Sequence, residues 1–139
     1  MKKRLAFAVL VALAVYVVAE RITSALTPPP AQMADPDGHF WLLSGISGVV
    51  CLLAASAGSW IARGRFLKLA LVLWAIPTAA AMVVGYRLQL PAEPITFGVF
   101  ALRNLPMLSA TLAGTLAGVV LGKSLAGHKR VADGTPAAT

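Results

Sequence analysis

Four long runs without a single charged residue dominate the sequence, and charged residues lie close to both ends of each. The runs are 5–19, 40–62, 69–86 and 104–122. A helix needs about 20 apolar residues to cross a bilayer, because only a backbone with internal hydrogen bonds is stable in the hydrocarbon core. The second, third and fourth runs meet this need. The chain is therefore predicted to be a membrane protein that crosses the bilayer several times.

The first run is too short to cross a bilayer alone, so its helix is expected to continue to Leu26, before the prolines at 28–30. Glu20 and Arg21 then lie near the membrane interface. A cleaved signal peptide over residues 1–25 is the alternative, since a basic start, an apolar run and small residues near Ala25 are typical of one. The charged pair before that site favours a retained helix.

Composition excludes several classes of function. Hydrophobic residues make up 58% of the chain and charged residues 12%, whereas about a quarter of a soluble domain is charged. The net charge of +7 does not indicate nucleic acid, because the basic residues punctuate the apolar runs instead of forming one solvated face. Cys51 is the single cysteine, so the chain can form no internal disulfide and has no Cys-x-x-Cys pair. No metal site and no cofactor are expected.

The basic residues indicate the topology. Nine of the twelve fall on one side of the predicted spans: Lys2, Lys3, Arg4, Arg63, Arg65, Lys68, Lys123, Lys129 and Arg130. Arg21, Arg87 and Arg103 fall on the other side, together with four of the five acids. By the positive-inside rule, both termini are cytoplasmic. The predicted location is a bacterial-type inner membrane.

These observations predict an all-α integral membrane protein, a four-transmembrane-helix bundle with both termini inside. Residues 1–125 form a single membrane domain, and residues 126–139 a disordered cytoplasmic tail. The expected spans are about 5–26, 40–62, 67–87 and 104–122, with an outer loop at 27–39 and an outer segment at 88–103.

The stretch from Pro91 to Pro106 allows two arrangements. In the first, residues 95–102 form an interfacial or re-entrant segment, and Pro106 lies in the first turn of the last span, where proline is tolerated. In the second, one kinked helix over 95–122 carries Arg103 into the membrane. The first is favoured because it does not bury a cation.

The candidate site is a polar cluster on the outer side, made of Glu20, Arg87, Glu93, Arg103 and Asn104. Its structural interpretation is that Arg103 reaches the headgroups or pairs with Glu20 or Glu93. Its functional interpretation is a polar vestibule that admits an anion or a lipid headgroup.

The last span carries small residues at four-residue intervals: Ala110, Gly114, Gly118 and Gly122. Such a stripe allows two helix backbones to approach closely. Its partner is either the second span, where Ser44, Gly48, Ala54 and Gly58 show similar spacing, or another copy of the last span. Contact within the chain is favoured.

No catalytic set can be placed at one depth, so the chain is not expected to be an enzyme. With Glu20 at the interface, no span interior holds Asp, Glu, Lys or His, which argues against a proton-coupled antiporter. By exclusion, the predicted function is a small accessory, assembly or structural subunit of a larger membrane complex. Its partners are the bilayer and other membrane subunits or a second copy. The alternative is an oligomeric channel or transporter for a small or anionic solute, or for a lipid.

The topology is open to a direct test. Reporter domains fused at Thr139 and within residues 27–38 should read inside and outside, respectively, because nine basic residues hold the termini in the cytoplasm. An outside reading at Thr139, or a mature chain that begins near Leu26, would contradict four spans with both ends inside.

Overall fold

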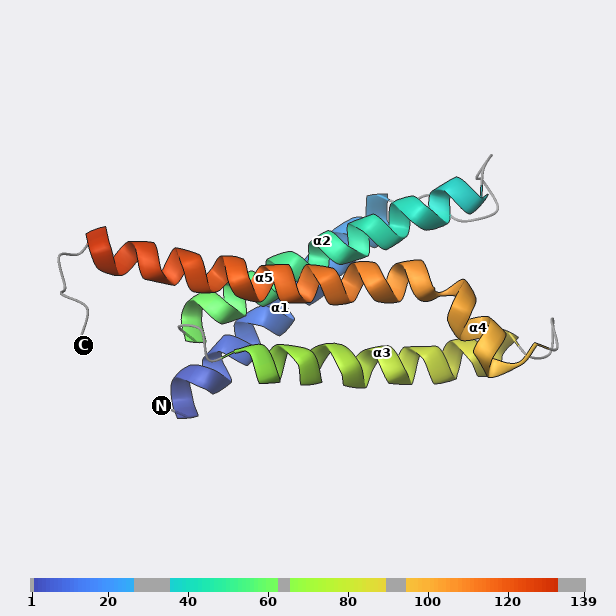
Figure 1. Cartoon of the computed structure of the whole chain (residues 1–139), viewed down its shortest axis with the longest axis horizontal. Helices are drawn as coiled ribbons and strands as arrows, with labels where there is room; N and C mark the ends of the chain where they lie inside the picture. The colour runs from blue at the N-terminus through green and yellow to red at the C-terminus, as the bar shows by residue number, and fades with distance from the viewer. Residues whose placement is uncertain (1, 27–35, 63–65, 90–94, 133–139) are drawn as a thin grey trace.

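The computed structural model describes residues 2–26, 36–62, 66–89 and 95–132, and these form helices with short flanking turns (Figure 1). The five helices are α1 (Lys2–Leu26), α2 (Pro36–Ala62), α3 (Leu67–Gln89), α4 (Phe97–Arg103) and α5 (Leu105–Ala132). Four of them are long and apolar enough to cross a membrane: Lys3–Leu26, Phe40–Ala62, Leu67–Leu88 and Leu105–His128. The expected set of four long apolar helices is thus confirmed.

All four long helices extend beyond the expected spans, α2 and α5 by the most. α2 begins at Pro36, so residues 36–39 are helical and not part of the outer loop. Proline suits this first position, because its missing N–H would have no partner inside the helix. α5 continues to Ala132, so residues 126–132 are helical and the expected disorder is wrong there. Ala, Leu, Lys and Arg in this stretch are good helix formers. The rest of the expected tail, 133–139, lies outside the described residues.

The chain breaks its helix at Asn104, so a single helix over 95–122 does not form. Thr96 caps the start of α4, and its hydroxyl accepts a hydrogen bond from the Val99 N–H at 3.5 Å. At the other end, the Asn104 side-chain amide donates to the Phe100 carbonyl at 2.9 Å. α5 then starts at Leu105 with Pro106 in its first turn, as the favoured arrangement requires.

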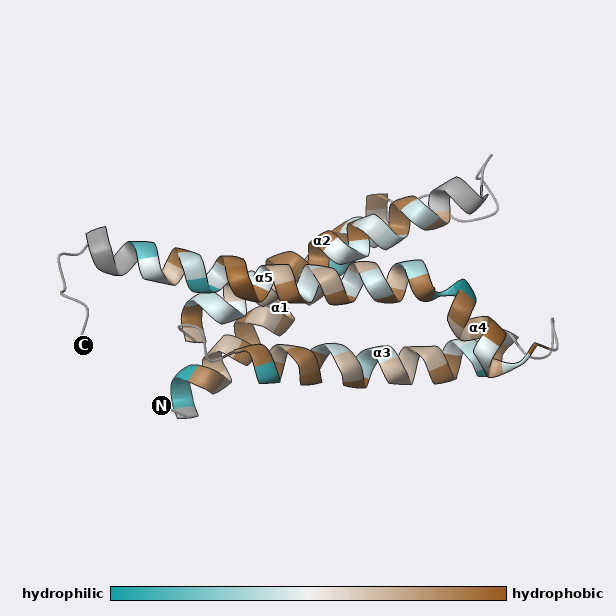
Figure 2. Ribbon diagram, in the orientation of Figure 1, coloured by the Kyte–Doolittle hydropathy of each residue, from teal (hydrophilic) through white to brown (hydrophobic). Residues whose placement is uncertain are grey.

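The four long helices pack unequally. α2 makes its most extensive contacts with α5 and also packs against α1, so these three form one unit with α2 in the middle. α3 stands apart from this unit along most of its length, and α4 joins its end to the start of α5 (Figure 1). Hydrophobic residues, brown in Figure 2, recur along each of the long helices.

Small residues allow the close contact between α2 and α5. The neighbours of the α5 stripe are Gly48 for Ala110 and Gly114, Leu52 and Ala55 for Gly118, and Ser56 and Ser59 for Gly122. The Ser59 hydroxyl donates to the Val119 carbonyl oxygen at 2.8 Å, and Ser59 is fully buried. A serine reaches the backbone of a neighbouring helix only when the two helices are in close contact, so this bond and the glycines depend on each other.

Glycine-to-alanine substitutions should lower the stability of the protein at this interface but not elsewhere on α5. A Cβ at Gly114 would collide with the Gly48 backbone, so Gly114→Ala should destabilise the fold by about 1 to 3 kcal/mol. Gly127→Ala, in the same helix but with nothing within 4 Å, should be neutral or stabilising by up to about 1 kcal/mol. Thermal unfolding in detergent measures both. Equal stability of the two variants would contradict the close contact.

Candidate functional site

Large side chains hold α3 at a distance from the other helices. Phe66, directly before α3, is 1% exposed and packs its ring onto Gly58 of α2. In the middle, the Trp74 indole N–H donates to the Thr111 hydroxyl of α5 at 3.1 Å. At the far end, the Tyr86 ring contacts two phenylalanines, and its hydroxyl donates to the Ile95 carbonyl oxygen at 3.1 Å.

The two phenylalanines belong to α4. The Tyr86 ring lies 5.3 Å from Phe97, edge to face, and 5.8 Å from Phe100, centre to centre. Phe100 is buried and also touches the position where Gly85 would carry a Cβ, at 3.2 Å. These aromatic contacts attach α4 to the end of α3. They hold the two helices together at the end of the molecule opposite the two chain termini (Figure 1).

A cavity of about 530 Å³ lies between α3 and the unit formed by α1, α2 and α5. This volume is in the range of small-molecule sites, about 300 to 1,000 Å³. All five helices contribute side chains to its wall. Helices α1 and α3 make no extensive contact with each other, so helix packing does not close the side of the cavity between them.

Polar groups are distributed unevenly along the cavity. α1 and α3 run from the end that holds the termini toward the α4 end, and α2 and α5 run in the reverse direction (Figure 1). Residue numbers therefore order the wall along the cavity axis. Near the termini the wall is apolar, with Ala12, Ala55, Phe66, Ala70 and Leu73. The middle holds Tyr16, Cys51, Thr78, Thr111 and Thr115, and the α4 end holds Glu20, Ser47 and Asn104.

Several of these polar groups lie close to one another. Tyr16 and Glu20 lie one helical turn apart on the face of α1 that lines the cavity. Cys51 of α2 and Thr115 of α5 both belong to the wall, and the Thr115 hydroxyl donates to the Thr111 carbonyl oxygen at 2.8 Å. Among the described residues of the wall, Glu20 is the only charged side chain. No group of three or more metal-ligating side chains occurs in the part of the chain that was described.

Only two members of the expected polar cluster line this cavity, Glu20 and Asn104. Arg87 and Arg103 are exposed on α3 and α4 and are not part of the described wall. Glu93 lies outside the described residues. Within the described residues, the cavity therefore has an acid but no base facing it, which does not suit an anion. The expected packing residues face α2 and do not line the cavity: Ala110, Gly114, Gly118 and Gly122.

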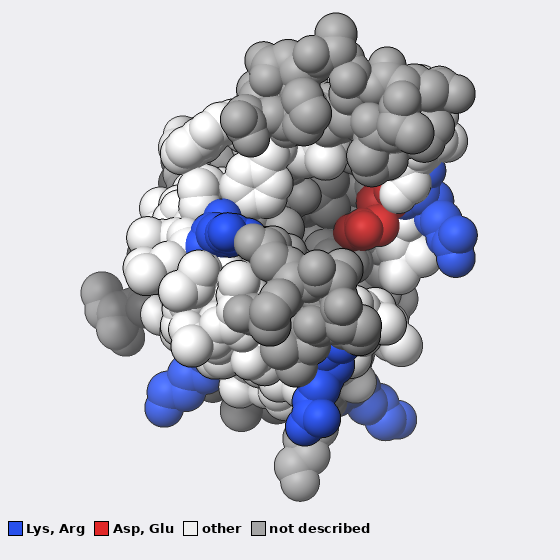
Figure 3. All heavy atoms as spheres, turned by 90° about the vertical axis from the view of Figure 1, so that its right-hand side faces the viewer, with Lys and Arg blue, Asp and Glu red and all other residues white. Residues whose placement is uncertain are grey.

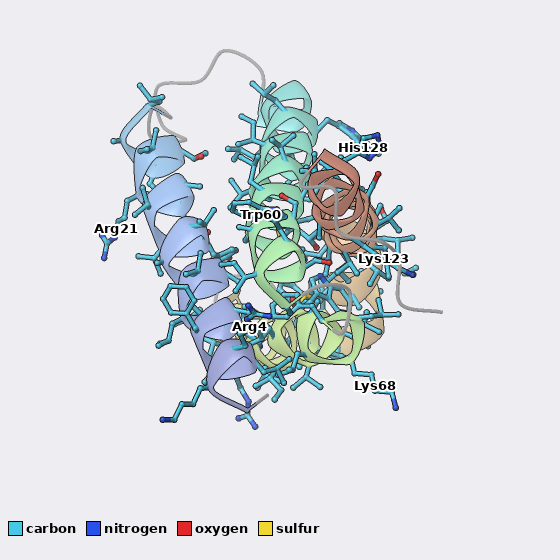
Figure 4. The ribbon with its side chains drawn as sticks, turned by 90° about the vertical axis from the view of Figure 1, so that its left-hand side faces the viewer. Arg4, Arg21, Trp60, Lys68, Lys123 and His128 are labelled. Atoms are coloured by element: carbon cyan, nitrogen blue, oxygen red, sulfur yellow. The ribbon has the colours of Figure 1, made fainter. Side chains whose placement is uncertain are left out.

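The charged side chains near Glu20 differ in direction. Arg21 points away from the other helices (Figure 4), whereas its neighbour Glu20 lines the cavity. The view onto the α4 end shows acidic atoms beside a hollow in the surface, with basic atoms farther out (Figure 3).

Sequence reasoning assigned Glu20 to the interface and missed Tyr16 as a residue of the site. The four-residue spacing of these two residues on one helix was the available signal.

Comparison of the chain with models of protein families, with curated protein sequences and with solved structures finds no match. A proposal of function therefore has to be argued from the cavity and its wall.

Proposed function

We propose that this protein binds a single-chain, lipid-like molecule in the cavity between α3 and the other helices. The observation that carries the proposal is a cavity of about 530 Å³ that is apolar at one end and open to the side. With the helices across a membrane, the opening between α1 and α3 faces acyl chains. A hydrophobic chain can then enter from the bilayer without crossing water.

The volume distinguishes this occupant from a transmembrane helix of a partner. A helix about 10 Å across with a rise of 1.5 Å occupies about 120 Å³ per residue, so a span of about 20 residues needs about 2,400 Å³. The whole of the empty space in and in front of the cavity is about 1,500 Å³, with open solvent included. A chain-like small molecule fits this space, and a helix does not.

The orientation in the membrane is also part of the proposal. We infer that the termini face the cytoplasm of a bacterial-type cell and that α4 lies on the outer side of its inner membrane. In support, α1 begins and α5 ends at the same end of the molecule (Figure 1). Arg4, Lys68 and Lys123 lie around that end (Figure 4), as the positive-inside rule expects of a cytoplasmic face. The apolar end of the cavity is then the inner one.

Quenching of Trp74 fluorescence tests whether a chain enters the cavity. Trp74 is part of the cavity wall, and the other two tryptophans, Trp41 and Trp60, are replaced by phenylalanine so that only Trp74 reports. Titration of the protein in neutral detergent with a brominated single-chain maltoside should quench Trp74 in a saturable way. Quenching in simple proportion to the bromine content of the micelle would contradict binding of the maltoside's hydrocarbon chain in the cavity.

Two substitutions in α3 provide the matched control for this titration. Ala81 lines the cavity, and Ala81→Phe should occupy part of its volume and weaken saturable quenching about tenfold, the equivalent of about 1.4 kcal/mol. Ala80 is exposed and is not part of the wall, so Ala80→Phe should leave the titration unchanged. If Ala80→Phe and Ala81→Phe weakened quenching equally, the brominated hydrocarbon chain would bind outside the cavity.

A second candidate function is that of an accessory or structural subunit in a larger membrane complex. The observation that favours it is the poor burial of two helices. In the apolar 18-residue stretch of each helix, the share that is buried within the protein is 11% for α1 and for α3, compared with 28% for α2 and for α5. These surfaces are available to other membrane subunits or to a second copy, because small and apolar faces pack well in lipid.

Mass determination of the intact assembly tests the subunit role. The protein is extracted from its own membranes with a mild detergent, and the mass of the complex is compared with that of one chain, 14.4 kDa. A complex with other proteins would support an accessory subunit. A single protein molecule or a homo-oligomer would contradict that role and leave the binding of a lipid-like molecule as the proposed function.

A further inference from the structure

We propose that the cavity selects amphiphiles with a positively charged, hydrogen-bond-donating head, an ammonium group, and that Glu20 binds this head. The inference rests on the proposed function and adds to it the chemical class of the ligand. The chain of the ligand would lie toward Phe66, and its head would lie at the α4 end of the cavity. Three properties of the wall support this orientation and charge.

The first property is the sign of the charge. Glu20 is the only charged side chain in the described wall, and no lysine, arginine or histidine of the described residues lines the cavity. A sulfate or phosphate head placed there would be repelled by the carboxylate with no cation to compensate. An ammonium head would meet its counter-ion at the wall of a largely apolar cavity, where the attraction between opposite charges is stronger than in bulk water.

The second property is the capacity of Glu20 to accept hydrogen bonds. A carboxylate has two oxygens and about four lone-pair positions. Tyr16 lies one helical turn before Glu20, and both side chains are on the face of α1 that lines the cavity. The lone-pair positions of Glu20 can accept from an ammonium group, which carries three donors when it is primary. Hydrogen bonds between charged partners are about twice as strong as neutral ones.

The third property is the depth of Glu20. It lies six residues before the end of α1 at Leu26, which is about 9 Å along the helix axis. Arg21, beside it, points away from the bundle (Figure 4), as a cation does near the edge of a membrane. The head of a bound amphiphile would therefore lie near one surface of the bilayer. Its chain would extend past the polar middle of the cavity to the apolar wall at Ala12 and Ala70.

The experiment compares two heads on one chain. The protein with Trp74 as its only tryptophan is titrated in neutral maltoside micelles with a brominated dodecyl ammonium and with the matching dodecyl sulfate. The Ala81→Phe variant corrects for partition of each probe into the micelle. The ammonium should quench Trp74 at a concentration at least about tenfold lower than the sulfate, once this correction is made.

Substitution of the acid identifies the group that selects the head. Glu20→Gln keeps the shape and removes the charge, so the ammonium should bind about tenfold more weakly and the sulfate no more weakly than before. Arg21→Gln is the control, because Arg21 points away from the bundle, and both titrations should be unchanged. If Glu20→Gln does not fold, the comparison of the two heads on the unsubstituted acid still decides.

The outcomes separate the two proposals. Saturable quenching by both probes with equal affinity, or tighter binding of the sulfate, would overturn the selection of an ammonium head. The proposal that the cavity binds a single-chain amphiphile would stand. An ammonium preference that persists in Glu20→Gln would overturn the role of Glu20. Absence of saturable quenching by either probe would overturn the proposed function itself.

Discussion

The close contact between α2 and α5 is the interaction on which the rest of the structure depends. Lipid offers no hydrophobic drive for helix association, so the helices must gain from packing and hydrogen bonding. Glycine at 48, 114 and 118 allows the two backbones to meet, and Ser59 then reaches the Val119 carbonyl oxygen. This contact places α2 in the middle of the fold, with α1 on another face of it.

The same chain builds a cavity by the opposite means. Where α5 meets α2, side chains are small and the helices touch. The contacts at the α3 level are made by large side chains: Phe66 against α2, Trp74 against α5 and Tyr86 against α4. Large residues at three levels act as spacers, and small ones between them, such as Ala70 and Ala81, leave the volume unfilled. The size of side chains along α3 therefore determines where empty space can persist.

The sequence predicts the long helices well, because hydropathy over a span is a local property. The break before α5 was also accessible, since Pro106 requires a helix start nearby. The ends at 36–39 and 126–132 were read as loop and tail because they are polar, yet polarity alone does not end a helix. The cavity was out of reach, because it depends on how far α3 stands from α5, and no local pattern encodes that distance.

Glu20 shows why depth along a helix is not enough to assign a role. Its position in the sequence suggested an interfacial residue, but the face of α1 on which it lies directs it into the cavity. A charge in the middle of a bilayer costs about 2.5 to 3.5 kcal/mol on insertion scales, and the penalty falls toward the edge. Under the proposed selection, a bound ammonium head offsets part of this penalty. The acid that makes the empty cavity less stable then gives the occupied cavity its preference for a cation.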